Sequence, residues 1–72
     1  MASVSEVCAI TQIGHTAGAI WQTLSENGPQ TIARLIKEVD APRDVVLQAI
    51  GWLAREHKIE IDEGRSRTVS LR

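Results

Sequence analysis

The stretch "TIARLIKEVDAPRDVVLQAIGWLAREHKIEI", Thr31 to Ile61, decides the fold because it encodes two short helices, the turn between them and the start of a strand. Apolar residues at three- and four-residue steps predict a helix over 32–39 and another from Pro42 to about Glu56. Thr31 is a favourable N-cap for the first of these. Proline disfavours the helical conformation at the residue before it, and it suits the first position of a new helix. The stretch therefore predicts a helix-turn-helix.

A hairpin is predicted directly after this pair of helices. Ile59 and Ile61 alternate with acidic residues. Over residues 68–72, Val69 and Leu71 alternate with polar residues in the same way. The segment 63–66 between them is a turn centred on Gly64. Two such runs separated by a glycine turn are typical of a β-hairpin. A hairpin in this position is the wing of a winged helix.

A longer amphipathic helix is predicted before the pair. Its apolar stripe consists of Ile10, Ile13, Ala17, Ile20 and Leu24. The helix should end at Asn27-Gly28-Pro29, because glycine adopts the left-handed C′ conformation and proline cannot continue the turn. The extended link that follows allows a short strand. The predicted fold is α+β, with three helices and a two-stranded wing over residues 10–72, preceded by an N-terminal arm or first helical turn over residues 1–9.

Size, charge and composition narrow the class of protein. The chain has 72 residues, enough for one domain, and a formal net charge of −1, which argues against strong nonspecific binding to nucleic acid. A single cysteine, Cys8, excludes an internal disulfide. The chain has neither a long apolar run nor the pattern of a signal peptide. We therefore expect a cytoplasmic protein that does not enter a membrane.

No catalytic constellation is apparent. Cys8 and His15 are seven residues apart, but two ligands are too few for a structural zinc site, which needs four. A Cys-His pair also lacks an orienting partner for nucleophilic catalysis. Phosphate-binding loops and dinucleotide fingerprints are absent from the sequence. The sequence therefore predicts a protein that is not an enzyme and binds no metal or cofactor.

Glycines and tryptophans are placed unusually. Gly14 and Gly18 are one turn apart, and we expect another element to pack closely against their bare backbone. Trp21 and Trp52 are expected to pack on the core, Trp52 between the third helix and the wing; the alternative for Trp52 is an interface anchor. Gly51 falls on the outward side of the third helix. We expect a DNA groove, a partner or the chain's own N-terminal segment to lie against it.

The segments "IGHTAGAIWQTLSENG" (13–28) and "AIGWLAREHKIEI" (49–61) carry a family resemblance. They are similar to a family of small bacterial and archaeal winged helix-turn-helix domains, catalogued as a domain of unknown function. The resemblance covers roughly Ile10 to Leu71. His57 departs from it, because the family suggests a small or acidic residue before Lys58. What the resemblance implies is the fold, with DNA binding as the general expectation for winged helices and no activity to carry over.

Two functions from different classes are predicted. In the first, the chain is a transcription-associated DNA-binding module whose third helix enters the major groove. Double-stranded DNA, weakly bound by the chain alone, is then the partner. The alternative is a protein-interaction or dimerisation module that uses the outer face of the third helix without DNA. The residues predicted to contact DNA, from that helix face, its end and the wing, are Arg43, Leu47, Gln48, Gly51, Arg55, Lys58, Arg65 and Arg67.

Overall fold

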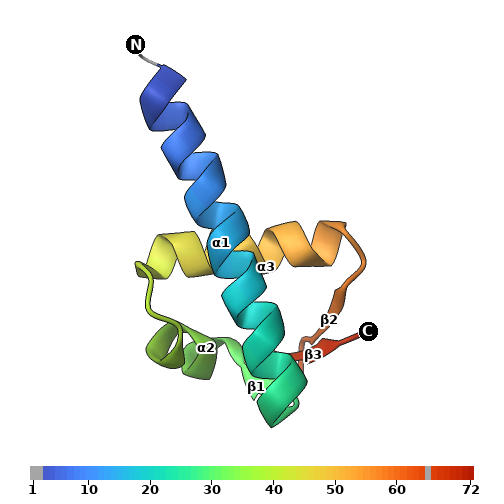
Figure 1. Ribbon diagram of the computed structural model, residues 1–72. Coiled ribbons are helices and arrows are strands. Elements are labelled where there is room, and N and C mark those ends of the chain that lie inside the picture. The colour runs from blue at the N-terminus through green and yellow to red at the C-terminus, as the bar shows by residue number, and fades with distance from the viewer. Residues whose placement is uncertain (1–2, 65) are drawn as a thin grey trace.

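The computed structural model describes residues 3–64 and 66–72, and their side chains from Ala9 onward. Three helices are followed by a small sheet at one end of the molecule (Figure 1). The elements in chain order are α1 (Ser3–Asn27), β1 (Gln30–Thr31), α2 (Ile32–Glu38), α3 (Arg43–Arg55), β2 (Ile59–Asp62) and β3 (Thr68–Leu71). This is the winged helix-turn-helix predicted from the sequence.

The first helix, α1, is the longest element and gives the molecule its elongated shape, with extents of 43 × 23 × 22 Å. It crosses α3, and its N-terminal part extends beyond the other elements (Figure 1). It ends as predicted: Gly28 has a φ of +79°, and its N–H donates to the carbonyl of Leu24 at 2.9 Å. Ile10 was predicted to be part of the buried stripe, and this was wrong. Its side chain is 59% exposed, because that part of α1 projects past the core.

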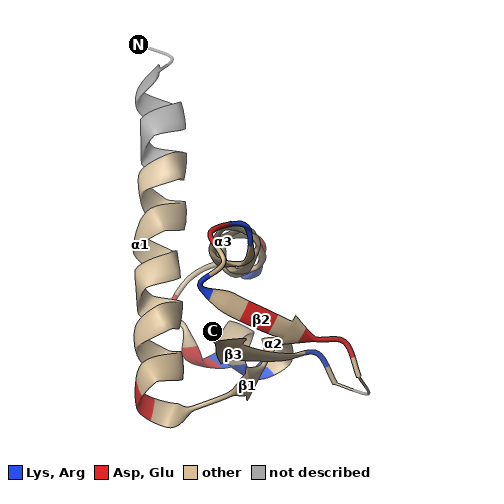
Figure 2. Cartoon of the chain, turned by 90° about the vertical axis from the view of Figure 1, so that its right-hand side faces the viewer, with Lys and Arg blue, Asp and Glu red and all other residues tan. Residues whose placement is uncertain are grey.

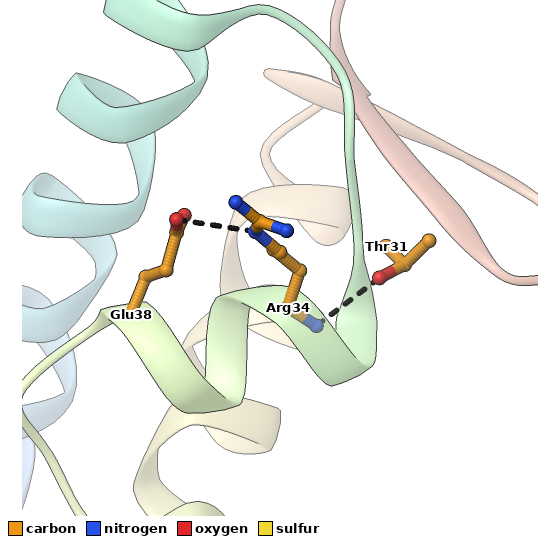
Figure 3. Close-up of polar contacts among 3 residues, drawn as sticks. All are labelled: Thr31, Arg34 and Glu38. Carbon is orange, nitrogen blue, oxygen red and sulfur yellow. Dashed lines mark hydrogen bonds and ion pairs between the residues drawn. The ribbon is translucent and has the colours of Figure 1, made fainter.

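Local capping sets the start of α2. Thr31 Oγ1 accepts a hydrogen bond from the N–H of Arg34 at 3.1 Å, as expected for an N-cap (Figure 3). One turn later Arg34 Nε pairs with Glu38 at 3.2 Å, on the exposed side of the helix. The helix stops at Val39, and α3 begins directly after Pro42. The two helices and the turn between them therefore form the predicted helix-turn-helix.

The sheet has three strands in the order β1-β3-β2, all antiparallel. In the wing, Ile59 lies opposite Leu71 and Asp62 lies opposite Thr68. The link between α1 and α2 supplies β1, whose Gln30 pairs with Val69. In this way β1 joins the wing to the start of the helix-turn-helix. The N–H of Ile32 also donates to the carbonyl of Arg67 at 2.9 Å, which strengthens that connection.

One hydrophobic core lies where the three helices and the sheet meet. Its fully buried large side chains come from every layer: Ile20, Leu35, Val46 and Val69. The face of α3 toward α1 is buried along its length, as the helical periodicity predicts, through Val46, Ala49, Ile50 and Leu53. This packing fixes which side of α3 faces outward.

Two kinds of feature are absent from the described residues. No helix of residues 3–64 and 66–72 is long and apolar enough to cross a membrane. The same part of the chain contains no group of three His, Cys, Asp or Glu side chains that could hold a metal ion.

Candidate nucleic-acid interface

The outer face of α3 is open along the whole helix. The exposed residues on it are Arg43, Asp44, Leu47, Gln48, Gly51 and Arg55. Asp44, Gln48, Gly51 and Arg55 lie opposite the buried stripe. Arg43 and Leu47 lie on one flank of it, and both are exposed. Arginine and glutamine can read guanine and adenine edges, and they occupy the N-terminal half of the helix, which recognition helices use.

The wing is a second exposed element beside α3. Figure 2 shows α3 nearly end-on beside α1, with the turn between β2 and β3 reaching out on the side away from α1. Arg67 is exposed just before β3. Arg65, predicted to act with it, lies outside the described residues.

Lys58 does not join this face. It lines a groove between α1 and α3, together with Trp21 and Trp52. Its backbone is paired with the C-terminal residue, since the N–H of Arg72 donates to the carbonyl of Lys58 at 3.1 Å. The structure therefore places the predicted residues of α3 on one exposed part of that helix, Arg67 at the start of β3, and Lys58 in the groove.

The charge of this face is balanced. In α3, Arg43 and Arg55 stand against Asp44, a net charge of 2 − 1 = +1. Residues 59–71 contain Arg65 and Arg67 against three acids, Glu60, Asp62 and Glu63, a net charge of 2 − 3 = −1. The two segments sum to zero. Because nonspecific affinity comes from neutralising phosphates, such a face can attract DNA only weakly without specific contacts.

The tryptophans are not core residues, and the prediction that they pack on the core was wrong. Trp21 is 45% exposed and Trp52 is 47% exposed, and both line the groove between α1 and α3. The same groove is lined by the small residues Gly14, Ala17 and Gly18 of α1. The alternative held for Trp52, an interface anchor, is consistent with this exposure.

The prediction for the two glycines of α1 was also wrong. An added Cβ at Gly14 or Gly18 would meet no atom within 4 Å among the described residues, so no other element packs against them. The same holds for Gly51, which excludes the described part of the chain's own N-terminal segment as its neighbour. Sequence reasoning missed the groove because it assigned each tryptophan to the core separately. The spacing of Ile10, Gly14, Gly18 and Trp21 on one stripe of α1 was the available signal.

Comparison with known proteins agrees with this architecture. The sequence profile that matches residues 9–71 is that of the "Winged helix-turn-helix domain (DUF2582)". The uncharacterized protein MJ1608 of Methanocaldococcus jannaschii is 40% identical over 50 residues, which are 67% of this chain and 71% of the archaeal protein. Among solved structures, NMB1585, a MarR family regulator from Neisseria meningitidis, superposes with a TM-score of 0.71 at 24% identity. That match covers 99% of this chain and 58% of the regulator, so the likeness is one of fold.

Proposed function

Since the chain belongs to the family of the winged helix-turn-helix domain (DUF2582), we propose that it is a DNA-binding module that places α3 in the major groove and its wing against the backbone. The observation that carries the proposal is the open outer face of α3. The chain also resembles a MarR family regulator in its fold, and this likeness of fold supports the proposal. A role in transcription follows from the same proposal.

In the proposed complex, residues in the first half of α3 contact the base edges. Gln48 can form a bidentate pair with adenine, and Arg43 can reach guanine or a phosphate. Leu47, 41% exposed beside them, offers an apolar contact for a thymine methyl group. Gly51 carries no side chain, so the backbone of α3 can approach the floor of the groove closely at that point. Asp44 is an unfavourable neighbour for phosphate at the start of α3, and its Oδ1 accepts from the N–H of Val45 at 3.0 Å.

Backbone contacts fall to Arg55 at the end of α3 and to the wing. Arginine pairs well with phosphate because its planar guanidinium presents several donors at once. Because α3 and the wing together have no net charge, these few phosphate contacts cannot give strong binding by themselves. Contacts to base edges must supply the rest of the affinity. We therefore expect binding that is selective for sequence, weak for a single chain, and favoured by low ionic strength.

The test is a titration of duplex DNA, selected from a randomised pool at low salt, into labelled protein while amide shifts are followed. Shifts should cluster on α3 and around Arg67. Replacing both reading residues in Arg43→Ala/Gln48→Ala should weaken binding at least tenfold. The matched control is Gly14→Gln/Gly18→Gln on α1, far from the outer face, which should bind the same duplex site. Absence of binding below millimolar concentration, or shifts centred on another surface, would refute the proposal.

A further inference from the structure

The groove between α1 and α3 takes no part in the proposed duplex interface. It has a volume of about 610 Å³ and lies between two helices that cross each other (Figure 1). The residues assigned to the base edges of a duplex, Arg43, Leu47 and Gln48, do not line it. An occupant of the groove and a duplex on the outer face of α3 would therefore contact different residues.

Two indole rings line the groove, one from each helix. Trp21 of α1 is 45% exposed and Trp52 of α3 is 47% exposed, so each side chain leaves about half of its surface in water. An exposed aromatic ring is a platform on which a nucleic-acid base can stack, and every base has a face that suits it. A tryptophan packed inside the core could not do this. The exposure of both rings therefore gives the groove two stacking platforms.

Glycines leave the α1 side of the groove bare. Gly14 and Gly18 line it, and an added Cβ at either would meet no atom within 4 Å among the described residues. From Gly14 to Trp21, seven residues further on, the groove follows α1 for about 10 Å. That length matches about three nucleotides of a stacked strand, at about 3.4 Å each. A flat and elongated occupant therefore fits the groove.

Cations gather where the groove meets the end of α3. His57, Lys58 and Arg72 line it there, and no side-chain carboxylate lines it among the described residues. The N–H of Arg72 donates to the carbonyl of Lys58 at 3.1 Å, and Arg72 Nη1 lies 3.4 Å from Nδ1 of His57, so the three groups stay together. The one ion pair in the described part of the chain is Arg34–Glu38. Lys58 and Arg72 are therefore available to an anionic ligand.

The number of contacts favours a strand over a single nucleotide. A nucleoside monophosphate has one base and one phosphate, whereas the groove offers two aromatic rings and two permanent cations, Lys58 and Arg72. Phosphates that follow α1 also meet little repulsion. Figure 2 shows that the described side chains of this helix include one acid near its C-terminal end, Glu26, and no other acidic or basic residue.

We propose that the groove binds single-stranded nucleic acid, with bases stacked on Trp21 and Trp52 and phosphates against Lys58 and Arg72. Aromatic platforms beside a cationic groove are the two components of sites that bind single strands without sequence preference. With both sites filled, the chain holds a duplex on the outer face of α3 and an unpaired strand in the groove. The proposal does not depend on duplex binding.

The test is a titration of the full chain with a labelled oligothymidylate of about eight nucleotides at low salt, followed by fluorescence anisotropy. Tryptophan fluorescence should be quenched over the same range, because the bases stack on the indoles. Two phosphate contacts predict a slope of about −1.4 for log K against log salt, at about −0.7 for each phosphate of a single strand.

Stacking is tested at Trp52 with two variants that differ in keeping a ring. Trp52→Leu should weaken binding of the strand at least about fivefold, because it removes the platform and keeps an apolar side chain. Trp52→Phe retains an aromatic ring and should bind within about twofold of the wild-type chain. Circular dichroism checks that both variants are folded.

The phosphate contact is tested with a matched pair of lysines. Lys58→Ala should make the salt slope shallower by about 0.7. Lys37→Ala removes the same charge from the exposed side of α2 and should leave the slope unchanged. Thymidine monophosphate should bind at least about tenfold more weakly than the strand, because it engages one ring at a time. Unlabelled duplex should not displace the strand.

Five results would each overturn the proposal. They are absence of binding below millimolar concentration, equal slopes for the two lysine variants, wild-type affinity in Trp52→Leu, equal affinities for the monophosphate and the strand, and displacement of the strand by duplex. A chain that binds the strand but no duplex would support this proposal and refute the duplex interface, so the two proposals fail independently.

Discussion

The N–H of Lys58 donates to the carbonyl of Leu53 at 3.0 Å and so closes the C-terminus of α3. The N–H of His57 donates at the same time to the carbonyl of Ala54 at 3.1 Å. These two bonds form a Schellman motif, which requires the residue at C′ to be left-handed. That residue is His57, with a φ of +59°. Glycine is the usual choice there, so the chain accepts local strain where α3 passes into the wing.

Replacing His57 with glycine should remove this strain and make the chain more stable. A non-glycine residue in the left-handed region costs about 1–2 kcal/mol. Glycine loses part of that gain to its own chain entropy, about 0.5–1 kcal/mol. His57→Gly should therefore raise the free energy of unfolding by about 0.5–1 kcal/mol, measured by urea denaturation. The control is His15→Gly in the middle of α1, which should lower it. Equal effects at the two histidines would contradict the role of the left-handed turn.

Truncation of the core face of α3 should be severe. Leu53 is 4% exposed, and Leu53→Ala should lower the free energy of unfolding by about 2–5 kcal/mol through lost burial and a residual cavity. This is a large share of the stability of a small domain. Leu47→Ala, on the exposed side of the same helix, should change it by less than about 0.5 kcal/mol. Thermal and urea denaturation followed by circular dichroism compare the two; a mild Leu53 variant would mean that α3 packs differently.

Replacing glycine with alanine should raise the free energy of unfolding at Gly51 and lower it at Gly28. Gly51 is helical, exposed and free of neighbours within 4 Å among the described residues, so Gly51→Ala should raise the free energy of unfolding by about 0.5–1 kcal/mol. Gly28 has a φ of +79°, and alanine there should cost about 1–2 kcal/mol. Differential scanning calorimetry of the two variants gives the comparison. A destabilised Gly51→Ala would show that glycine is needed at that position within the folded chain.

The salt dependence of DNA binding should be shallow. If Arg43, Arg55 and Arg67 each neutralise one phosphate, log K against log salt should have a slope of about −2.7. Arg67→Ala should reduce the steepness by about one unit and weaken binding similarly for different sequences. Arg72→Ala, which alters the groove instead of the outer face, should leave the slope unchanged. Fluorescence anisotropy of a labelled duplex over a salt series measures all three chains, and an unaltered slope for Arg67→Ala would remove the wing from the contact.

Much of the fold could be predicted because its determinants are local. The cap at Thr31, the break at Pro42 and the left-handed Gly28 each act through neighbouring backbone groups, and each is where the sequence indicates. The alternation in the wing likewise predicted the burial of Ile59 and Val69. The left-handed His57 could not be predicted, because the sequence around it contains no glycine at the end of α3.

The sequence by itself determined the order of the elements, their caps and the core face of α3, since helical periodicity and turn chemistry act within a few residues. Only the tertiary structure decided that Trp21 and Trp52 stand half exposed in one groove and that Gly14 and Gly18 have no neighbour among the described residues. A helical wheel gives the direction of a side chain about its own axis. Whether another element covers that direction depends on where α1 crosses α3 and on how far α1 continues past the core.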